Sequence, residues 1–260
     1  MTVRDALVEA ERRLAAAGVD TPRVDAEWLL AHVLGTTRSG LYAELDREAG
    51  EGWRPLVSRR EAREPLAYVL GEWGFRRLTV KTDARALVPR PETEVAVERA
   101  LALLEGTPSP RVVDIGAGSG AIALALKDER PDALVTAVDV SPDALALARE
   151  NAERLGLDVE LREGGIETAA EGWDLVISNP PYVETLAGLQ PELRFEPEQA
   201  LVGAGLHVRI ARAANTRFLV LEVGDGQAER VAASLTALGY RSVRVTEDLA
   251  GVERIVEGCR

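Results

Sequence analysis

The sequence predicts an α/β protein with a mostly parallel sheet, closed at one edge by an antiparallel hairpin and preceded by a small helical domain. Three observations carry this prediction. Short apolar runs alternate with helical stretches from Arg111 onward, a glycine-rich loop follows the first of these runs, and only helical patterns occur before residue 72. Regular alternation of strand and helix is typical of a parallel sheet with helices on both faces.

Residues 1–71 are predicted to form the helical domain. Val3, Leu7 and Leu14 recur at helical spacing, and Gly18 ends this first helix. Further helices are expected at 22–34, 41–45, 53–63 and 66–70. A plain helical bundle and a substrate-recruiting domain both fit this pattern.

Residues 72–88 are predicted to be a β-hairpin linker, because apolar and polar residues alternate from Trp73 to Val80 between glycines. Residues 89–260 are expected to form one ligand-binding domain. Its helices are expected at 92–104, 121–129, 143–155 and 227–238. Its strands are expected at 111–115, 134–138, 159–162, 175–177, 218–223, 242–246 and 254–257, the last two pairing as the edge hairpin.

Composition limits the classes of function. A chain of 260 residues with 46% hydrophobic residues can build one large or two modest domains. The net charge of -12 argues against broad electrostatic binding of nucleic acid. Cys259 is the only cysteine, and His32 and His207 are the only histidines, so we expect neither a disulfide nor a metal site. Without a signal-peptide pattern or a long apolar run, a cytoplasmic protein is expected.

A glycine-rich loop joins the first strand of the larger domain to its helix. Its residues are Gly116, Ala117, Gly118, Ser119 and Gly120. Glycines let the backbone approach a ligand closely and expose N–H groups at the helix start. Asp139 ends the next strand, and a carboxylate about 20 residues after such a loop can accept hydrogen bonds from both hydroxyls of a ribose. NAD enzymes and S-adenosylmethionine enzymes both fit this pattern.

A second motif, Asn179-Pro180-Pro181-Tyr182, follows a buried strand. The two prolines stop the strand, so Asn179 is expected at the carboxyl edge of the sheet, where ligands bind. The Asn179 amide oxygen and the Pro180 carbonyl are two acceptors suited to a substrate NH2 group, and Tyr182 offers a flat face. A proline-rich turn capped by asparagine is the structural alternative. The motif favours a methyl donor over a hydride donor, because no acid or base is clearly placed for hydride transfer.

These motifs together resemble a class I S-adenosylmethionine-dependent methyltransferase, a Rossmann-like fold, of the type that carries Asn-Pro-Pro-Tyr. Residues 64–71, 88–94, 194–197, 221–227 and 248–254 are similar to the bacterial peptide chain release factor N5-glutamine methyltransferases, the PrmC/HemK family. The resemblance implies methyl transfer from S-adenosyl-L-methionine to the side-chain amide nitrogen of the glutamine in the Gly-Gly-Gln loop of translation release factors. It also implies that residues 116–120 and Asp139 bind the cofactor, and that residues 179–182 bind the glutamine, with Asn179 close to the cofactor.

The chain departs from the family pattern in three places. Gly164 and Gly165 stand where family members carry an acidic residue near the adenine, which leaves Ile166 to pack on that ring. The region after Leu201 is shortened, and residues 214–217 replace a glycine turn before the fifth strand. A truncated helix there is expected to loosen the sheet edge.

An amide nitrogen is a poor nucleophile, so the site must hold it in line with the methyl carbon. Asn179 and Pro180 are expected to orient it and Tyr182 to cover it, and such positioning supplies ~7–11 kcal/mol at best. Two rival functions remain. One is an adenine-N6 or cytosine-N4 nucleic-acid methyltransferase, which would have to flip a base, and the other is a non-catalytic cofactor-binding module. We expect a monomer that binds release factors, with no direct nucleic-acid binding and no membrane association.

Overall fold

The computed structural model describes residues 1–183, 185 and 188–260. The chain divides into two compact units. The first comprises Met1–Glu72 and Leu189–Phe195, and the second comprises Trp73–Gly188 and Glu196–Arg260. The short segment Leu189–Phe195, which sequence order alone assigns to the larger domain, thus belongs to the first unit. No helix in the described part of the chain is both long and apolar enough to cross a bilayer.

The first unit is helical. Its elements are α1 (Val3–Ala16), α2 (Pro22–Leu34), α3 (Arg38–Leu41), α4 (Trp53–Glu61), α5 (Leu66–Leu70) and the 3₁₀ helix η2 (Pro191–Phe195). Thr2 and Asp5 form a capping box at the start of α1. The short third helix was expected at 41–45 and lies earlier, because Thr37 caps it by accepting a hydrogen bond from Gly40 N at 3.0 Å.

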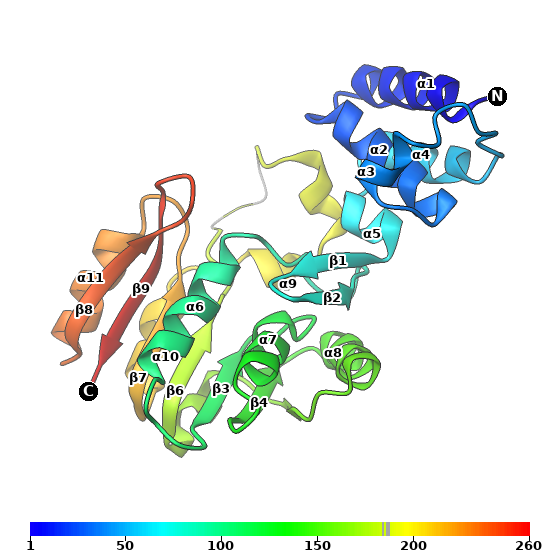
Figure 1. The fold of residues 1–260 in the computed structure, drawn as a ribbon. Helices are drawn as coiled ribbons and strands as arrows, with labels where there is room; N and C mark the ends of the chain where they lie inside the picture. The colour runs from blue at the N-terminus through cyan, green and yellow to red at the C-terminus, as the bar shows by residue number, and fades with distance from the viewer. Residues whose placement is uncertain (184, 186–187) are drawn as a thin grey trace. The chain divides into compact units, whose positions relative to one another are not determined.

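The second unit contains two sheets (Figure 1). The hairpin of β1 (Glu72–Phe75) and β2 (Leu78–Lys81) forms the small one. The large one has the order β5-β4-β3-β6-β7-β9-β8, parallel except that β9 runs antiparallel to both neighbours. Its strands are β3 (Arg111–Ile115), β4 (Leu134–Asp139), β5 (Glu160–Glu163), β6 (Trp173–Ser178), β7 (Thr216–Glu222), β8 (Arg241–Glu247) and β9 (Glu253–Cys259). The expected parallel sheet with an antiparallel edge hairpin is confirmed.

Seven helices of the described chain belong to this unit. They are α6 (Thr93–Leu103), α7 (Ala121–Glu129), α8 (Pro142–Leu155), η1 (Ile166–Glu171), α9 (Glu198–Leu201), α10 (Leu206–Ala213) and α11 (Ala228–Ala237). The sequence interpretation missed η1 and α9, which have six and four residues, and gave no bounds for the truncated helix that it expected after Leu201, which is α10. Short helices carry few turns of periodic pattern, so tertiary packing decides them.

Alternate residues of each central strand pack on opposite sides of the sheet. Val112 of β3 and Leu175 of β6 pack in one core with α6 and α7, whereas Val113 and Val176 pack in another with α10 and α11. All four side chains are fully buried. Burial on both faces explains why these strands have continuous apolar runs rather than alternating ones.

The strand order reverses between β3 and β6. The chain moves outward from β3 to β4 and β5, then returns to place β6 on the other side of β3. Asp114 pairs with Ile177, and Ser178 Oγ donates a hydrogen bond to the Ile115 carbonyl oxygen at 2.6 Å. The glycine loop after Ile115 and the Asn-Pro-Pro-Tyr motif after Ser178 therefore begin at the same level, at the point where open α/β sheets bind ligands.

Candidate active site

A cavity of about 390 Å³ lies at the carboxyl ends of β3, β4 and β6. This is within the ~300–1,000 Å³ usual for small-molecule pockets. The cavity brings together most of the predicted site residues: Gly116, Ala117, Gly118, Ser119, Asp139, Ile166, Asn179, Pro180 and Pro181. Gly120 and Tyr182 are not among the residues that line it.

Asp139 is already tied to the backbone around it. Its Oδ2 accepts a hydrogen bond from Gly118 N at 2.9 Å, and its Oδ1 accepts one from Ser141 N at 2.9 Å. Each carboxylate oxygen has two lone pairs, so one per oxygen remains for a ligand. The carboxylate is thereby held in one orientation, with capacity left to accept two ribose hydroxyls.

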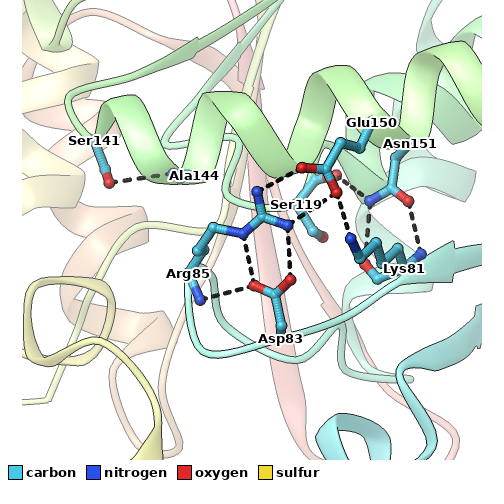
Figure 2. Close-up of polar contacts among 8 residues, drawn as sticks. All are labelled: Lys81, Asp83, Arg85, Ser119, Ser141, Ala144, Glu150 and Asn151. Carbon is cyan, nitrogen blue, oxygen red and sulfur yellow. Dashed lines mark hydrogen bonds and ion pairs between the residues drawn. The ribbon is translucent and has the colours of Figure 1, made fainter.

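The glycine loop is fixed from outside by Asn151, a residue that the sequence interpretation did not select. Asn151 lies on α8, is fully buried, and donates from Nδ2 to the Ser119 carbonyl oxygen at 3.0 Å. The same side chain accepts from Lys81 N at 2.6 Å and donates to Lys81 O at 3.1 Å (Figure 2). One carboxamide thus connects α8, β2 and the loop.

Ion pairs lie close to Asn151. Figure 2 shows Arg85 between the carboxylates of Asp83 and Glu150, at 2.7 Å from each, with Lys81 also paired to Glu150. The Arg85 and Lys81 hydrogen bonds lower the pKa of Glu150 to about 2, so it stays ionised at neutral pH. Arg85 also lines the cavity, and these partners hold its guanidinium in place.

Asn179 lies directly after β6, with one side of its amide already engaged. Its Nδ2 donates a hydrogen bond to Thr93 Oγ1 at 3.2 Å. Thr93 is the first residue of α6, is buried, and lines the cavity. This contact leaves the Asn179 carbonyl oxygen, Oδ1, to accept a hydrogen bond from a ligand.

Tyr182 packs beside the end of β7. A Cβ added at Gly224 would lie 2.8 Å from Tyr182 Cδ2, so glycine is needed for this close approach. Gln227 Nε2 donates to the Tyr182 carbonyl oxygen at 3.1 Å, and the His207 ring stacks on the tyrosine ring with centroids 6.5 Å apart. His207 is buried and contacts the Glu222 carbonyl oxygen through Nε2 at 2.9 Å.

The loop after β5 contains the departure at Gly165. Glu167 lies two residues further on, and its Oε1 accepts a hydrogen bond from Gly165 N at 2.7 Å. Gly164, Gly165, Ile166 and Glu167 all line the cavity. A carboxylate is therefore present at this wall of the cavity even though the residue at position 165 has no side chain.

The Val88–Arg90 segment is anchored by Glu196, another residue that the sequence interpretation did not assign. Glu196 accepts hydrogen bonds from Val88 N at 3.1 Å and from Arg90 Nη2 at 2.5 Å. Burial raises the pKa of Glu196, which Arg90 partly offsets. Arg90 and Arg209 both line the cavity and add positive charge to it. Among the described residues, no group of three His, Cys, Asp or Glu side chains is arranged to hold a metal ion.

Two family models match the chain. Residues 5–71 match the PrmC N-terminal domain, and residues 95–205 match the methyltransferase small domain. Full-length relatives include the release factor glutamine methyltransferase of Deinococcus radiodurans, 44% identical and covering 100% of this chain and 99% of its own. Those of Geobacter sulfurreducens and Moorella thermoacetica are 40% and 42% identical and cover 99% and 98% of this chain, and 96% and 97% of their own.

Solved structures show the same fold. The hMettl16 catalytic domain in complex with MAT2A 3'UTR hairpin 6 superposes with a TM-score of 0.58 at 15% identity, covering 78% of this chain and 81% of that chain. A methyltransferase from Pyrococcus furiosus superposes with a TM-score of 0.51 at 20% identity, covering 72% and 90%. At such identities the likeness concerns the fold alone. The class I methyltransferase fold expected from the sequence is confirmed.

Proposed function

Since the chain belongs to the family of release factor glutamine methyltransferases, we propose that it methylates the side-chain nitrogen of the glutamine in the Gly-Gly-Gln loop of translation release factors. The observation that carries this proposal is the position of Asn179 and Pro180. Both line the cavity that also contains the glycine loop and Asp139. This placement supports an acceptor pair for an NH2 group beside a nucleoside-type site.

The residues present fit S-adenosylmethionine, the methyl donor of this family. Asp139 retains lone pairs for ribose hydroxyls, and Ile166 provides an apolar surface for adenine. The glycine loop keeps side chains away from the ligand, because Gly116 and Gly118 have none. When bound, S-adenosylmethionine supplies an electrophilic methyl carbon on a positively charged sulfur.

The protein's own residues act by positioning the acceptor. Asn179 Oδ1 and the Pro180 carbonyl accept the two N–H groups of the substrate amide. The cover expected from Tyr182 has no support from the cavity lining, which does not include that residue. Held by Asn179 and Pro180, the amide nitrogen would lie in line with the methyl carbon that S-adenosylmethionine, held by the glycine loop and Asp139, would supply, and the nitrogen would lose one proton to water. Such orientation supplies ~7–11 kcal/mol at best.

We propose that the helical first unit recruits the release factor. Support comes from the match of residues 5–71 to the PrmC N-terminal domain, separate from the methyltransferase domain.

We further propose that the enzyme is a cytoplasmic monomer that does not bind nucleic acid directly. The net charge of -12 supports that last point, because phosphate binding needs an excess of Lys and Arg.

Incubation of the purified protein with release factor or DNA and isotopically labelled S-adenosylmethionine tests this function. We expect label on the Gly-Gly-Gln peptide by mass spectrometry, and none on DNA. Asn179→Ala should lower the rate by at least about 100-fold, since positioning of the amide is lost. Asn215→Ala, at an exposed position, is the matched control and should keep full activity. Label on DNA alone, or parental activity in Asn179→Ala, would contradict the proposal.

A further inference from the structure

Asn179, Thr93 and Glu222 lie next to one another beside the cavity, and the first two line it. Asn179 Nδ2 donates to Thr93 Oγ1 at 3.2 Å, and the Thr93 hydroxyl is close enough to the Glu222 carboxylate to favour its charged form, which lowers the pKa of Glu222. Glu222 ends β7, one residue beyond the Ser178–Leu221 pair, so it lies level with Asn179 on the neighbouring strand. Its exposed fraction is 2%, and its Oε2 has no hydrogen-bond partner among the described residues.

The ionised carboxylate sets the direction of these bonds. A carboxylate only accepts hydrogen bonds, so the single Thr93 hydroxyl proton must point toward Glu222. Thr93 Oγ1 then offers only lone pairs to Asn179. The asparagine must therefore present its NH2 group to Thr93. Its carbonyl oxygen, Oδ1, then points away from Thr93.

We propose that Glu222 and Thr93 are positioning residues that fix the Asn179 side-chain amide in the one orientation in which Oδ1 can accept a hydrogen bond from the substrate. This rests on the proposed function, because it assigns Asn179 the role of acceptor. With the amide reversed, Asn179 would present NH2 to the substrate NH2, and two donors would face each other. Neither Glu222 nor Thr93 needs to contact the reacting atoms.

The surroundings of Glu222 make its charge sensitive to pH near neutrality. Burial raises the pKa of Glu222 to about 7, although the Thr93 hydroxyl favours the charged form. Among neighbouring charges, Glu92 before α6 raises this pKa, whereas Arg254 of β9 and Arg90 lower it. Tyr182 and the His207 ring, which contacts the Glu222 backbone, are further titratable groups beside it.

Protonation of Glu222 removes the constraint on the amide. A protonated carboxyl can donate to Thr93 Oγ1, which frees the hydroxyl proton to point toward Asn179. The amide can then reverse. We therefore expect methyl transfer to fall as the pH drops through about 7, as the ionised form that sets the productive direction is lost.

Thr93→Val removes the hydroxyl at nearly constant volume and tests these contacts directly. The turnover rate should fall about 10- to 100-fold, the loss expected for a hydrogen bond to a charged system. S-adenosylmethionine affinity by calorimetry should stay within about twofold, because binding of the donor does not use this bond. Thr93→Ser should restore most of the rate.

Thr136→Val is the matched control. Thr136 is also buried and donates to a glutamate, Glu160 Oε2 at 2.8 Å, but it does not line the cavity. Its rate should remain within about twofold of the parent. An equal loss of rate in both valine variants would mean that loss of buried polar contacts, not orientation of Asn179, explains the effect, and would overturn the proposal.

Glu222→Gln separates charge from shape. A glutamine, like the protonated carboxyl, can donate to Thr93 as well as accept from it at every pH, so this variant should show the lowered rate of the protonated parent at every pH and lose the rise in rate above about pH 7. An unchanged pH profile would contradict the proposed role of the carboxylate.

A spectroscopic measurement keeps the test independent of methyl transfer. The ¹⁵N–¹H resonances of the Asn179 side-chain amide, identified by their loss in Asn179→Ala, should shift with a midpoint near pH 7 in the parent. This shift should be absent in Glu222→Gln and Thr93→Val. If the shift is present but release factor is not methylated, the proposed function fails and the positioning role stands. If release factor is methylated but the amide does not titrate in this way, the positioning role fails alone.

Discussion

Gly120 and Ala148 pack so closely that a side chain at position 120 would force Ala148 to shift. A Cβ on Gly120 would lie 3.2 Å from the Cβ of Ala148 on α8, and the backbone at Gly120 has a φ of 81°. Gly120 therefore meets two demands at once, a left-handed conformation and close approach of a helix. Gly120 packs against α8, on the side of the loop that does not face the cavity, and so it does not line the cavity.

Gly120→Ala should lower the free energy of unfolding by about 1–3 kcal/mol, from backbone strain and the contact with Ala148 together. Gly106→Ala is the matched control, because Gly106 has a φ of 73° but no atom within 4 Å of its Cβ position. Chemical denaturation of both variants measures the two contributions. Equal losses in both would mean that close approach contributes nothing.

Removal of the Asn151 carboxamide should loosen the glycine loop. Asn151→Ala leaves Ser119 O and both backbone groups of Lys81 without this partner, and unsatisfied buried groups cost about 1–3 kcal/mol each. We expect S-adenosylmethionine to bind about tenfold more weakly by calorimetry, since the loop must be ordered on binding. Asn215→Ala controls for loss of an exposed amide. Parental affinity in Asn151→Ala would show that the loop holds its shape without α8.

The stability of the protein should depend on the protonation of Asp114. Burial raises the pKa of Asp114 from its ordinary value of 3.8 to about 7, and the Asp139 carboxylate adds to this shift. A raised pKa in the folded state means that the protonated form favours folding. This contribution is complete below the pKa of the unfolded chain and is lost as the pH rises toward about 7.

Asp114→Asn should remove this dependence. We expect the difference in unfolding free energy between parent and variant to change by ~1.4 kcal/mol per pH unit between about pH 4 and about pH 7, with the parent losing stability as the pH rises. Above about pH 7 the difference should be constant. Urea denaturation at several pH values measures it, and a constant difference over the whole range would contradict the assigned pKa.

The strands and long helices could be read from the sequence because local pattern and packing agree there. The strand expected at 111–115 and the helices expected at 121–129 and 66–70 have the same bounds in the structure. Pro142 after the capping residue Ser141 also placed the start of α8 within one residue. At 41–45, by contrast, the apolar spacing indicated a helix, but the Thr37 cap starts it earlier.

The two ligand motifs could be recognised because each is a continuous stretch of chain. Their supporting residues could not. Thr93, Glu196 and Asn151 act through partners 86, 106 and 32 residues away, and no local pattern indicates such contacts. For Asn151, a polar residue among the buried positions of α8 was the available signal.

The shortened region after Leu201 still forms a helix. α10 has eight residues, and its buried Ile210 and Ala211 pack in the core shared by α11 and one face of the sheet. The Tyr240 hydroxyl donates to the Ala211 carbonyl oxygen at 2.9 Å, which satisfies one group at the helix end. Whether the shorter helix loosens the sheet edge stays a prediction.

The segment Leu189–Phe195 makes the first unit discontinuous along the chain. Glu192 in this segment pairs with Arg60 at 2.8 Å and with Arg63 at 2.7 Å, and Arg60 also pairs with Asp25 at 2.7 Å. Proteolytic cleavage between Glu72 and Trp73 would therefore not divide the molecule into its two units. The carboxyl-terminal fragment would keep Glu192, and the amino-terminal fragment would keep both of its arginine partners. A nicked protein whose fragments copurify is the expected product, and a fragment designed to start at Trp73 carries a piece of the other unit.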